Sequence, residues 1–407
     1  SFSAGLCLQE ALHYGKSVAK KVSTRFATWR CNPMPQKLRI GIVSGDLGNH
    51  PVGHFLESIL THLGSSRIEL IAYANNPATD ELTTRIKPDF TQWRPIFTLN
   101  DQAAAQLIHD DGIHVLLDLS GHTANNRLPV FAWKPAPVQA TWLGYFASTG
   151  VAEIDYLLAD ETGVPTNQHA HFSEAIWYLP DTRLCFTPPN TDLPISPLSA
   201  LNPATLTFGC YQNLAKINDE VLAAWGRIFT ALPQARLRLA AKQLGDATVV
   251  AQLQQRLQQH GIAQTRVSTY GSVSRQDYLA SHTEVDILLD TFPYPGGTTT
   301  CEALWMGVPT LTLAGNTLLA RQGASILTAA GLPDWIASSE DDYVAKAIHF
   351  ASDLPKLAAL RAGLREQVRT SPLFDAPRFA KHFEAALWGM WQAKGAPQHT
   401  QAHETSA

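Results

Sequence analysis

Short apolar runs alternate along this chain with longer segments in which apolar residues recur every three or four positions. The short runs predict buried strands, the longer segments predict amphipathic helices, and their alternation indicates βαβ units with a parallel sheet. The predicted strands are residues 39–46, 69–74, 113–118 and 156–159 in the first half and 206–210, 236–240, 267–270, 285–289 and 308–313 in the second. The predicted helices are residues 54–63, 101–109, 219–232, 248–260, 275–282, 298–306, 323–330, 341–351 and 357–370.

The two series are separated between residues 180 and 203 by a segment rich in Pro, Asn, Ser and Thr, which is typical of an extended connector. We therefore predict an α/β protein with two doubly wound, Rossmann-like domains that face one another across a cleft. The predicted parts are a helical N-terminal appendage (1–36), a first domain (37–180), a connector (181–205), a second domain (206–374), a C-terminal helix that crosses back onto the first half (375–393) and a disordered tail (394–407).

Composition narrows the possible partners of the chain. Its 407 residues are 45% hydrophobic and 16% charged, and the formal net charge is -4, so no global basic field favours nucleic acid. The apolar runs are strand-sized, which argues against a membrane span, and without a secretory signal we expect a cytoplasmic protein. Five scattered cysteines with no CxxC pair argue against disulfides and structural zinc, so we expect neither a metal nor a cofactor.

The segment from Asp290 to Glu302 follows a predicted buried strand, passes through a turn rich in Pro and Gly, and opens a helix with three threonines. Glycines let the backbone approach a ligand, and the N–H groups and dipole of a helix start attract anions. We expect a diphosphate at Gly297, Thr298 and Thr299, with ribose hydroxyls at Glu302. The alternative is a plain helix start capped by threonine, with an acid that favours the dipole.

Two more polar side chains follow the first strands of the two domains. Lys216 lies where it would neutralise phosphate charge, although a lysine in a loop is usually a solvated surface charge. His50 follows strand 39–46, and a histidine beside an anion site can serve as a general base. The alternative for His50 is a turn or capping histidine.

Residues 135–145 place the backbone N–H groups of Leu143 and Gly144 beside the aromatic residues Trp142 and Tyr145. Such mixtures of N–H groups and aromatic rings bind sugars. Core packing of the two aromatic residues is an equally good explanation.

Taken together, these segments resemble the catalytic region of the O-linked N-acetylglucosamine (O-GlcNAc) transferase family, which has the GT-B glycosyltransferase fold. The resemblance runs from about residue 38 to residue 374. Its motifs are Gly-Asn-His-Pro, Pro-Ala-Pro-Val-Gln-Ala-Thr-Trp-Leu-Gly-Tyr, Asn-Leu-Ala-Lys-Ile, Gly-Gly-Thr-Thr-Thr and Ala-Leu-Trp-Met-Gly-Val-Pro-Thr, in that order.

The resemblance implies a role for each matching position. The implied roles are the proposed catalytic histidine for His50, diphosphate binding for Lys216, a neighbouring polar contact for Asn213, β-phosphate contacts for Thr298 and Thr299, ribose binding for Glu302, and the wall of the sugar pocket for Leu143 and Gly144. Family members usually carry tetratricopeptide repeats before this region, so residues 1–36 are expected to be the last helices of such an array.

The chain departs from the family's animal members at two positions. Gly297 stands where they have a histidine, and Tyr278 stands where they stack a histidine on uracil. The Thr-Phe-Pro-Tyr run with three threonines also looks like the plant branch of the family, which includes protein O-fucosyltransferases that use GDP-fucose. Both departures bear on the preference for base and sugar.

The resemblance implies an inverting transfer of N-acetylglucosamine from UDP-GlcNAc to Ser or Thr hydroxyls of a protein acceptor. Because the chain has no clear Asp-x-Asp motif for a divalent metal, Lys216 and the helix start at Thr298 are expected to offset the charge of the leaving UDP. Three alternatives stay open: an O-fucosyltransferase, a UDP-sugar epimerase on the same fold, and a UDP-binding scaffold with weak or no catalysis.

Overall fold

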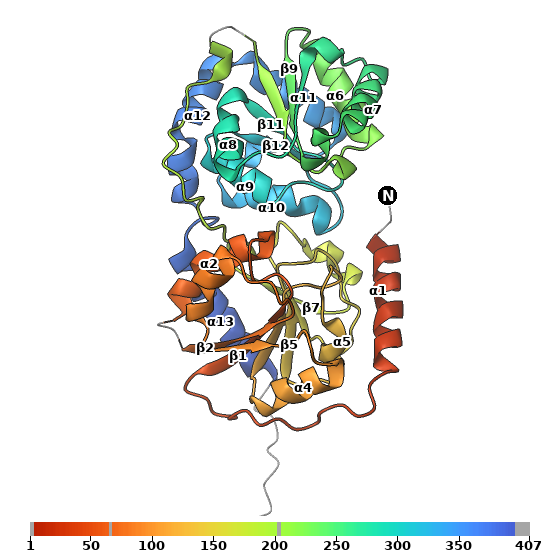
Figure 1. The fold of residues 1–407 in the computed structure, drawn as a ribbon, viewed down its shortest axis with the longest axis vertical. Helices are drawn as coiled ribbons and strands as arrows, with labels where there is room; N and C mark the ends of the chain where they lie inside the picture. The colour runs from red at the N-terminus through yellow and green to blue at the C-terminus, as the bar shows by residue number, and fades with distance from the viewer. Residues whose placement is uncertain (1–3, 65–66, 202–204, 395–407) are drawn as a thin grey trace, which may run out of the picture. The chain divides into compact units, whose positions relative to one another are not determined.

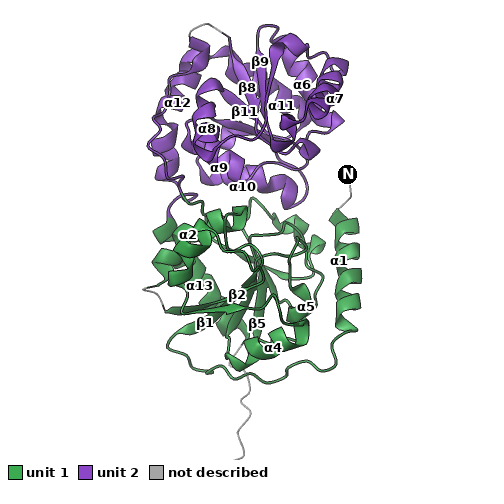
Figure 2. Cartoon of the chain, in the orientation of Figure 1, with its two compact units in different colours: residues 1–187, 376–407 green, residues 188–375 purple. Residues whose placement is uncertain are grey.

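The protein is described here from a computed structural model that covers residues 4–64, 67–201 and 205–394. The chain divides into two compact units. Unit 1 comprises Ser1–Thr187 and Ala376–Ala407, and unit 2 comprises Pro188–Asp375 (Figure 2). The expected tail, residues 394–407, lies outside the described residues except for Lys394.

Unit 1 is built on a seven-stranded parallel sheet with the order β3-β2-β1-β4-β5-β6-β7 (Figure 1). Its interior strand β1 is almost continuously apolar, and Leu38, Ile40 and Ile42 are at most 1% exposed, as expected for a strand covered on both faces. The strands are β1 (Leu38–Ser44), β2 (Ile68–Ala74), β3 (Gln92–Pro95), β4 (Val115–Asp118), β5 (Val138–Thr141), β6 (Tyr156–Ala159) and β7 (Ala175–Tyr178).

Three strands of unit 1 were not predicted from the sequence: β3, β5 and β7. Strand β5 has the sequence Val-Gln-Ala-Thr, which lacks the apolar run of a buried strand. Its Gln139 is nevertheless fully buried, because the side-chain amide donates hydrogen bonds to the backbone oxygens of Phe131 and Glu153, both at 2.9 Å. A buried polar side chain whose donor is satisfied in this way hides a strand from a hydrophobicity pattern.

The helices of unit 1 are α1 (Ala4–Ala19), α2 (Pro51–Leu63), α3 (Glu81–Ile86), α4 (Asp101–Asp110), α5 (Leu128–Phe131) and α13 (Ala376–Lys394). Helix α13 packs against α2, so the last helix does return to the first half of the chain. The helix predicted within residues 1–36 is shorter than that range, since residues 20–37 form no helix. Gly15 lets α1 approach residue Gly150, whose carbonyl oxygen would lie 1.8 Å from a Cβ atom at Gly15.

Unit 2 contains a six-stranded parallel sheet with the order β10-β9-β8-β11-β12-β13. Its strands are β8 (Thr207–Cys210), β9 (Arg236–Ala240), β10 (Val267–Tyr270), β11 (Ile287–Leu289), β12 (Thr310–Leu313) and β13 (Ile336–Ala337), of which only the two-residue β13 was not predicted. Its helices are α6 (Asp219–Ala231), α7 (Ala247–Gln259), α8 (Arg275–Ala280), α9 (Thr298–Trp305), α10 (Gln322–Ala329), α11 (Glu340–Ser352) and α12 (Leu354–Arg369). The two doubly wound α/β halves that the sequence predicts are therefore present.

Candidate active site

In unit 2, Lys216 occupies the loop that follows β8, at the carboxyl edge of the sheet. It ends a short 3-10 helix, η4 (Leu214–Lys216), which the Asn213 side chain caps by accepting a hydrogen bond from the Ala215 N–H at 3.0 Å. The Lys216 ammonium donates to the Pro295 carbonyl oxygen at 3.0 Å and lies 3.8 Å from the centre of the Tyr294 ring. The lysine that the sequence singled out therefore contacts the glycine-rich loop, residues 290–297, and is not solvated at the surface.

The glycine-rich loop is organised by Asp290, which directly follows β11 and is 1% exposed. Its Oδ1 atom accepts hydrogen bonds from the N–H groups of Thr291 (3.0 Å) and Gly296 (2.7 Å), and its Oδ2 atom accepts one from the Thr312 hydroxyl at 2.9 Å. Burial raises the pKa of Asp290 to about 6, while these bonds and the charge of Lys216 lower it. Burial in turn lowers the pKa of Lys216, and Asp290 raises it.

The start of α9 carries buried hydroxyl groups without hydrogen-bond partners among the described residues. Gly297 is the N-cap residue and supplies no side-chain cap, and the buried Oγ1 atoms of Thr298 and Thr300 have no hydrogen-bond partner in the described part of the chain. Unsatisfied buried hydroxyls at a helix start favour an anion, which would accept from them and from the free N–H groups. The structure therefore supports the anion site better than a simple threonine cap.

Gln212 connects Lys216 to the α9 start, and the sequence did not single it out. Its amide nitrogen donates to the Thr299 hydroxyl at 2.8 Å, and its amide oxygen accepts from the Lys216 ammonium at 3.3 Å. Since Gln212 belongs to no recognisable pattern beyond following a strand, only the structure could assign it this bridging position. Asn213, the next residue, takes no part in this bridge. Its side-chain oxygen accepts a hydrogen bond from the Gln243 side chain at 2.8 Å.

Glu302 lies one turn into α9 and is 2% exposed. Its carboxylate forms an ion pair with Arg275 of α8, with the Oε1 and Nη1 atoms 2.5 Å apart. Burial raises the pKa of Glu302, and Arg275 and Tyr278 lower it. The Tyr278 ring packs against the rings of Tyr211 and His282, with centroids 5.7 and 5.2 Å away. The structure brings the predicted ribose-binding acid and Tyr278 together.

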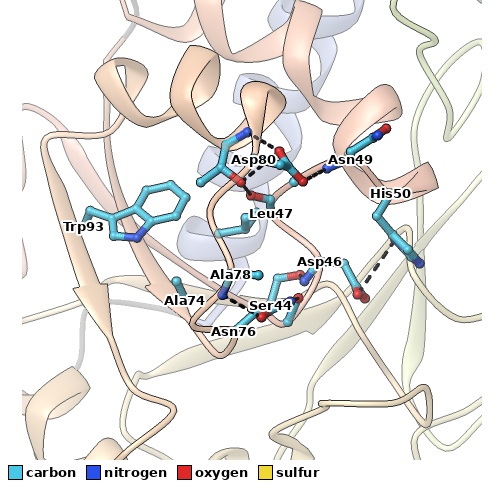
Figure 3. Close-up of a pocket in the computed structure, with 13 residues that line it drawn as sticks. Ser44, Asp46, Leu47, Asn49, His50, Ala74, Asn76, Ala78, Asp80 and Trp93 are labelled. Carbon is cyan, nitrogen blue, oxygen red and sulfur yellow. Dashed lines mark hydrogen bonds and ion pairs between the residues drawn. The ribbon is translucent and has the colours of Figure 1, made fainter. Parts of the chain in front are cut away.

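In unit 1, His50 lies in the loop after β1 and is the N-cap residue of α2. Its Nδ1 atom accepts a hydrogen bond from the Val52 N–H at 3.3 Å and lies 3.9 Å from an oxygen of Asp46. His50 lines a pocket of about 180 Å³ at the carboxyl ends of β1 and β2 (Figure 3). The other lining residues are Ser44, Gly45, Asp46, Leu47, Gly48, Asn49, Ala74, Asn76, Ala78, Asp80, Thr83 and Trp93. His50 is therefore a capping histidine that also faces a pocket.

Leu143 and Gly144 lie in the loop after β5, at the same edge of the unit 1 sheet. Leu143 is 4% exposed and has a φ angle of 73°, so the backbone turns sharply at this residue. A Cβ atom at Gly144 would lie 1.8 Å from the Leu119 carbonyl oxygen, which explains why this position is glycine. Trp142 is 2% exposed and packs against Phe383, so this aromatic residue belongs to the core.

No group of three or more His, Cys, Asp or Glu side chains suited to a metal ion occurs among residues 4–64, 67–201 and 205–394. Within the same described ranges, no helix has the length and apolar character needed to cross a bilayer.

Comparison with known proteins decides the family. A model of glycosyl transferase family 41 matches residues 3–186 and 199–383. The chain belongs to glycosyl transferase family 41. A crystal structure of an O-GlcNAc transferase mutant from Thermobaculum terrenum shares the fold of this family 41 chain with a TM-score of 0.90 and 36% identity, covering 97% of this chain and 75% of that one. These findings confirm the predicted family and its GT-B fold.

Plant proteins are also similar in sequence. The chain is 36% identical over 378 residues to the probable UDP-N-acetylglucosamine–peptide N-acetylglucosaminyltransferase SPINDLY of Solanum lycopersicum, covering 91% of this chain and 41% of that protein. It is 32% identical over 382 residues to the corresponding protein SEC of Arabidopsis thaliana, covering 90% of this chain and 38% of that protein. This family 41 chain thus spans about two fifths of the length of the curated relatives it matches.

Proposed function

We propose that this chain is the catalytic part of a transferase that moves N-acetylglucosamine from UDP-GlcNAc to Ser or Thr hydroxyls of proteins, with inversion and without a metal ion. The observation that carries the proposal is the arrangement at the α9 start, where a tethered ammonium, a glycine-rich loop and unpartnered threonine hydroxyls occur together. The names of the plant and bacterial relatives support this donor and a peptide acceptor.

Loss of the diphosphate is the step that this arrangement would assist. As the bond between the anomeric carbon and the diphosphate oxygen breaks, negative charge develops on the leaving UDP. The Lys216 ammonium, the N–H groups of the first turn of α9 and the Thr298 hydroxyl would stabilise that charge, because they are fixed before the reaction begins. This proposal assigns no role to a divalent cation, and addition of EDTA tests that part of it.

His50 is the proposed group on the acceptor side. It would orient the acceptor hydroxyl or take its proton as the hydroxyl oxygen attacks the anomeric carbon from the face opposite to the leaving group. Attack from that face inverts the configuration at this carbon. A tetratricopeptide array, where a longer protein carries one before this region, would help to choose the acceptor.

The decisive experiment offers the purified chain UDP-GlcNAc or GDP-fucose together with a protein extract or peptide library, with and without EDTA, and detects the product by mass spectrometry. We expect N-acetylglucosamine on Ser or Thr, unaffected by EDTA, and a loss of about 10²- to 10³-fold in Lys216→Ala, since charge stabilisation of this kind typically contributes that much. Lys356→Ala, which removes an exposed lysine of the same unit, is the matched control.

Other outcomes would each replace the proposal with a specific alternative. Transfer from GDP-fucose alone would make the chain an O-fucosyltransferase. Turnover of UDP-GlcNAc without a glycosylated product would indicate an epimerase, and binding of UDP without any turnover would indicate a scaffold. Full activity in Lys216→Ala would remove the lysine from the mechanism.

A further inference from the structure

Asp46 is the one carboxylate of the His50 pocket to which the described residues donate no hydrogen bond. It lies in the turn between β1 and α2, four residues before His50, and its side chain is only 15% exposed. Figure 3 shows its carboxylate pointing toward the imidazole ring, at the 3.9 Å separation between Oδ1 and Nδ1. A carboxylate that is largely buried and accepts no hydrogen bond is costly to keep ionised. This cost points to a further role for Asp46.

The hydrogen bond at His50 decides which ring nitrogen is free. With Nδ1 accepting from the Val52 N–H, a neutral ring carries its proton on Nε2 and can only donate from that atom. To accept a proton at Nε2, the ring must instead carry a proton on Nδ1. That proton would point toward Asp46, because the carboxylate already lies near Nδ1.

We propose that Asp46 is a positioning residue that selects the His50 tautomer with a proton on Nδ1 and a free lone pair on Nε2. The inference rests on the proposed function and deepens it by naming the group that makes His50 a base. The 3.3 Å bond from the Val52 N–H is long, so a small rotation of the ring can exchange it for a bond to Asp46.

In the proposed transfer step, one proton moves to His50 and one bond at the anomeric carbon replaces another. The acceptor hydroxyl gives its proton to Nε2 while its oxygen forms the new bond to the anomeric carbon, and UDP leaves with the electron pair of the broken bond. His50 becomes an imidazolium, and its Nδ1–H donates to the Asp46 carboxylate, which stays ionised and offsets the new positive charge. Burial raises the pKa of Asp46, and the positive charge of a protonated His50 beside it lowers that pKa.

Asp80 is the other acidic residue of the pocket, and it faces away from this pair. Its carboxylate accepts hydrogen bonds from the N–H groups of Asn49 (2.6 Å) and Thr83 (2.9 Å), and these bonds lower its pKa. The pocket lining contains no lysine or arginine. Asp80 therefore stabilises the loop at Asn49 and the start of α3. Asp46 is the carboxylate that lies near His50.

The test compares Asp46→Asn with Asp46→Ala, using Asp110→Asn on the outer helix α4 as the matched control. An asparagine amide can donate to Nδ1, which fixes the proton on Nε2 and removes the base, whereas alanine leaves the ring free to choose. We expect kcat to fall about 10²-fold or more in Asp46→Asn and less in Asp46→Ala, with KM for UDP-GlcNAc unchanged in both. A merely structural role predicts the opposite order, because asparagine is the closer replacement.

A second measurement does not depend on turnover. In protein labelled with ¹⁵N-histidine, with the His50 signals assigned by their loss in His50→Asn, wild type should show a population protonated on Nδ1 that is absent in Asp46→Asn. Identical tautomers in the two proteins, or an active Asp46→Asn enzyme alongside an inactive His50→Ala, would overturn the inference while leaving the proposed transferase intact. Failure of wild type to transfer any sugar would instead count against the proposed function, and the tautomer comparison would still decide the role of Asp46.

Discussion

The two units share one structural device, a buried aspartate at equivalent places in their sheets. In unit 1 the first strand, β1, pairs with β4, which ends in Asp118, and in unit 2 the first strand, β8, pairs with β11, which is followed by Asp290. Each aspartate is fully buried, accepts hydrogen bonds from backbone N–H groups of the turn that follows it, and accepts one more from a threonine on the next strand. The threonines are Thr141 and Thr312. Burial raises the pKa of both carboxyls to about 6.

The difference lies in what surrounds the two aspartates. Asp290 has the Lys216 ammonium as a charge partner and organises a long glycine-rich loop, whereas the charges that act on Asp118 include no cation. The loops after β1 and β8 also differ in how firmly their polar side chain is held. The Lys216 side chain makes two hydrogen bonds and a ring contact. The His50 side chain is 46% exposed and accepts one long hydrogen bond. The comparison indicates that the polar groups of the unit 2 loop are held in place by several contacts each, as the proposed anion site requires, whereas His50 in unit 1 has fewer contacts and can exchange partners more easily.

Removal of either buried carboxylate would break the shared device. We expect Asp118→Ala and Asp290→Ala each to lower the free energy of unfolding of their own unit by about 3 kcal/mol or more, because several buried donors lose their acceptor at once. Hydrogen exchange with mass spectrometry reads the two units separately. Asp341→Ala, at a position 85% exposed, is the control and should change little. A loss below about 1 kcal/mol in either variant would show that water replaces the carboxylate.

A change in the unit 2 loop should weaken binding without unfolding the protein. A Cβ atom at Gly296 would lie 2.2 Å from the Gln212 amide nitrogen and 2.6 Å from the Thr299 hydroxyl, so Gly296→Ala must displace the bridge to Lys216. We expect the Kd for UDP, measured by calorimetry, to rise about 10- to 100-fold, in line with a typical overpacking cost. Gly245→Ala in the same unit is the matched control, because its Cβ atom would meet nothing within 4 Å. An unchanged Kd would exclude this loop from the nucleotide site.

Much of this comparison was open to prediction from the sequence. Strand and helix periodicity placed four of the seven strands of unit 1 and five of the six strands of unit 2, and a polar residue after an apolar run placed Lys216 and His50 at carboxyl ends of strands. The sequence could not show that Gln212 bridges Lys216 and Thr299, since that contact joins residues 87 positions apart. It also could not reveal β5, because the amide nitrogen of its Gln139 finds its acceptors only through tertiary contacts. Patterns along the chain report burial and turns, but they do not report which buried polar groups meet.

The two raised pKa values predict a pH dependence of stability. Each folded carboxyl holds its proton up to about pH 6, while the unfolded chain releases it near pH 4, so between these values the folded state binds more protons. This contribution is fully present below about pH 4 and is lost as the pH rises from 4 through 6, by about 2–3 kcal/mol for each carboxyl, since one pKa unit is worth about 1.4 kcal/mol. The free energy of unfolding, measured by denaturant titration at several pH values, should fall less between pH 4 and 6 in Asp118→Asn and in Asp290→Asn than in wild type, because each variant lacks one of the two carboxyls.

Lys216 sharpens the pH prediction, because it acts on only one of the two carboxyls. Its charge lowers the pKa of Asp290, so Lys216→Ala should raise that pKa and move the loss of stability in unit 2 to higher pH. The unit 1 profile, which reports Asp118, should stay as it is in wild type. Equal shifts in both units would mean that the effect of the lysine is not local.

The smallest expected effect concerns Glu302, which has no counterpart at the corresponding place in unit 1. Since Arg275 is half exposed, Glu302→Gln breaks the ion pair while leaving the arginine in contact with water, and stability should change by less than about 1 kcal/mol. If the carboxylate accepts ribose hydroxyls, wild type should bind UDP several-fold more tightly than 2′-deoxy-UDP or 3′-deoxy-UDP, and Glu302→Gln should reduce that preference. Glu366→Gln, which removes an exposed carboxylate paired with Arg369, should leave it unchanged. A preference that persists in Glu302→Gln would assign the ribose to other groups and leave Glu302 as the partner that orients Arg275 and Tyr278.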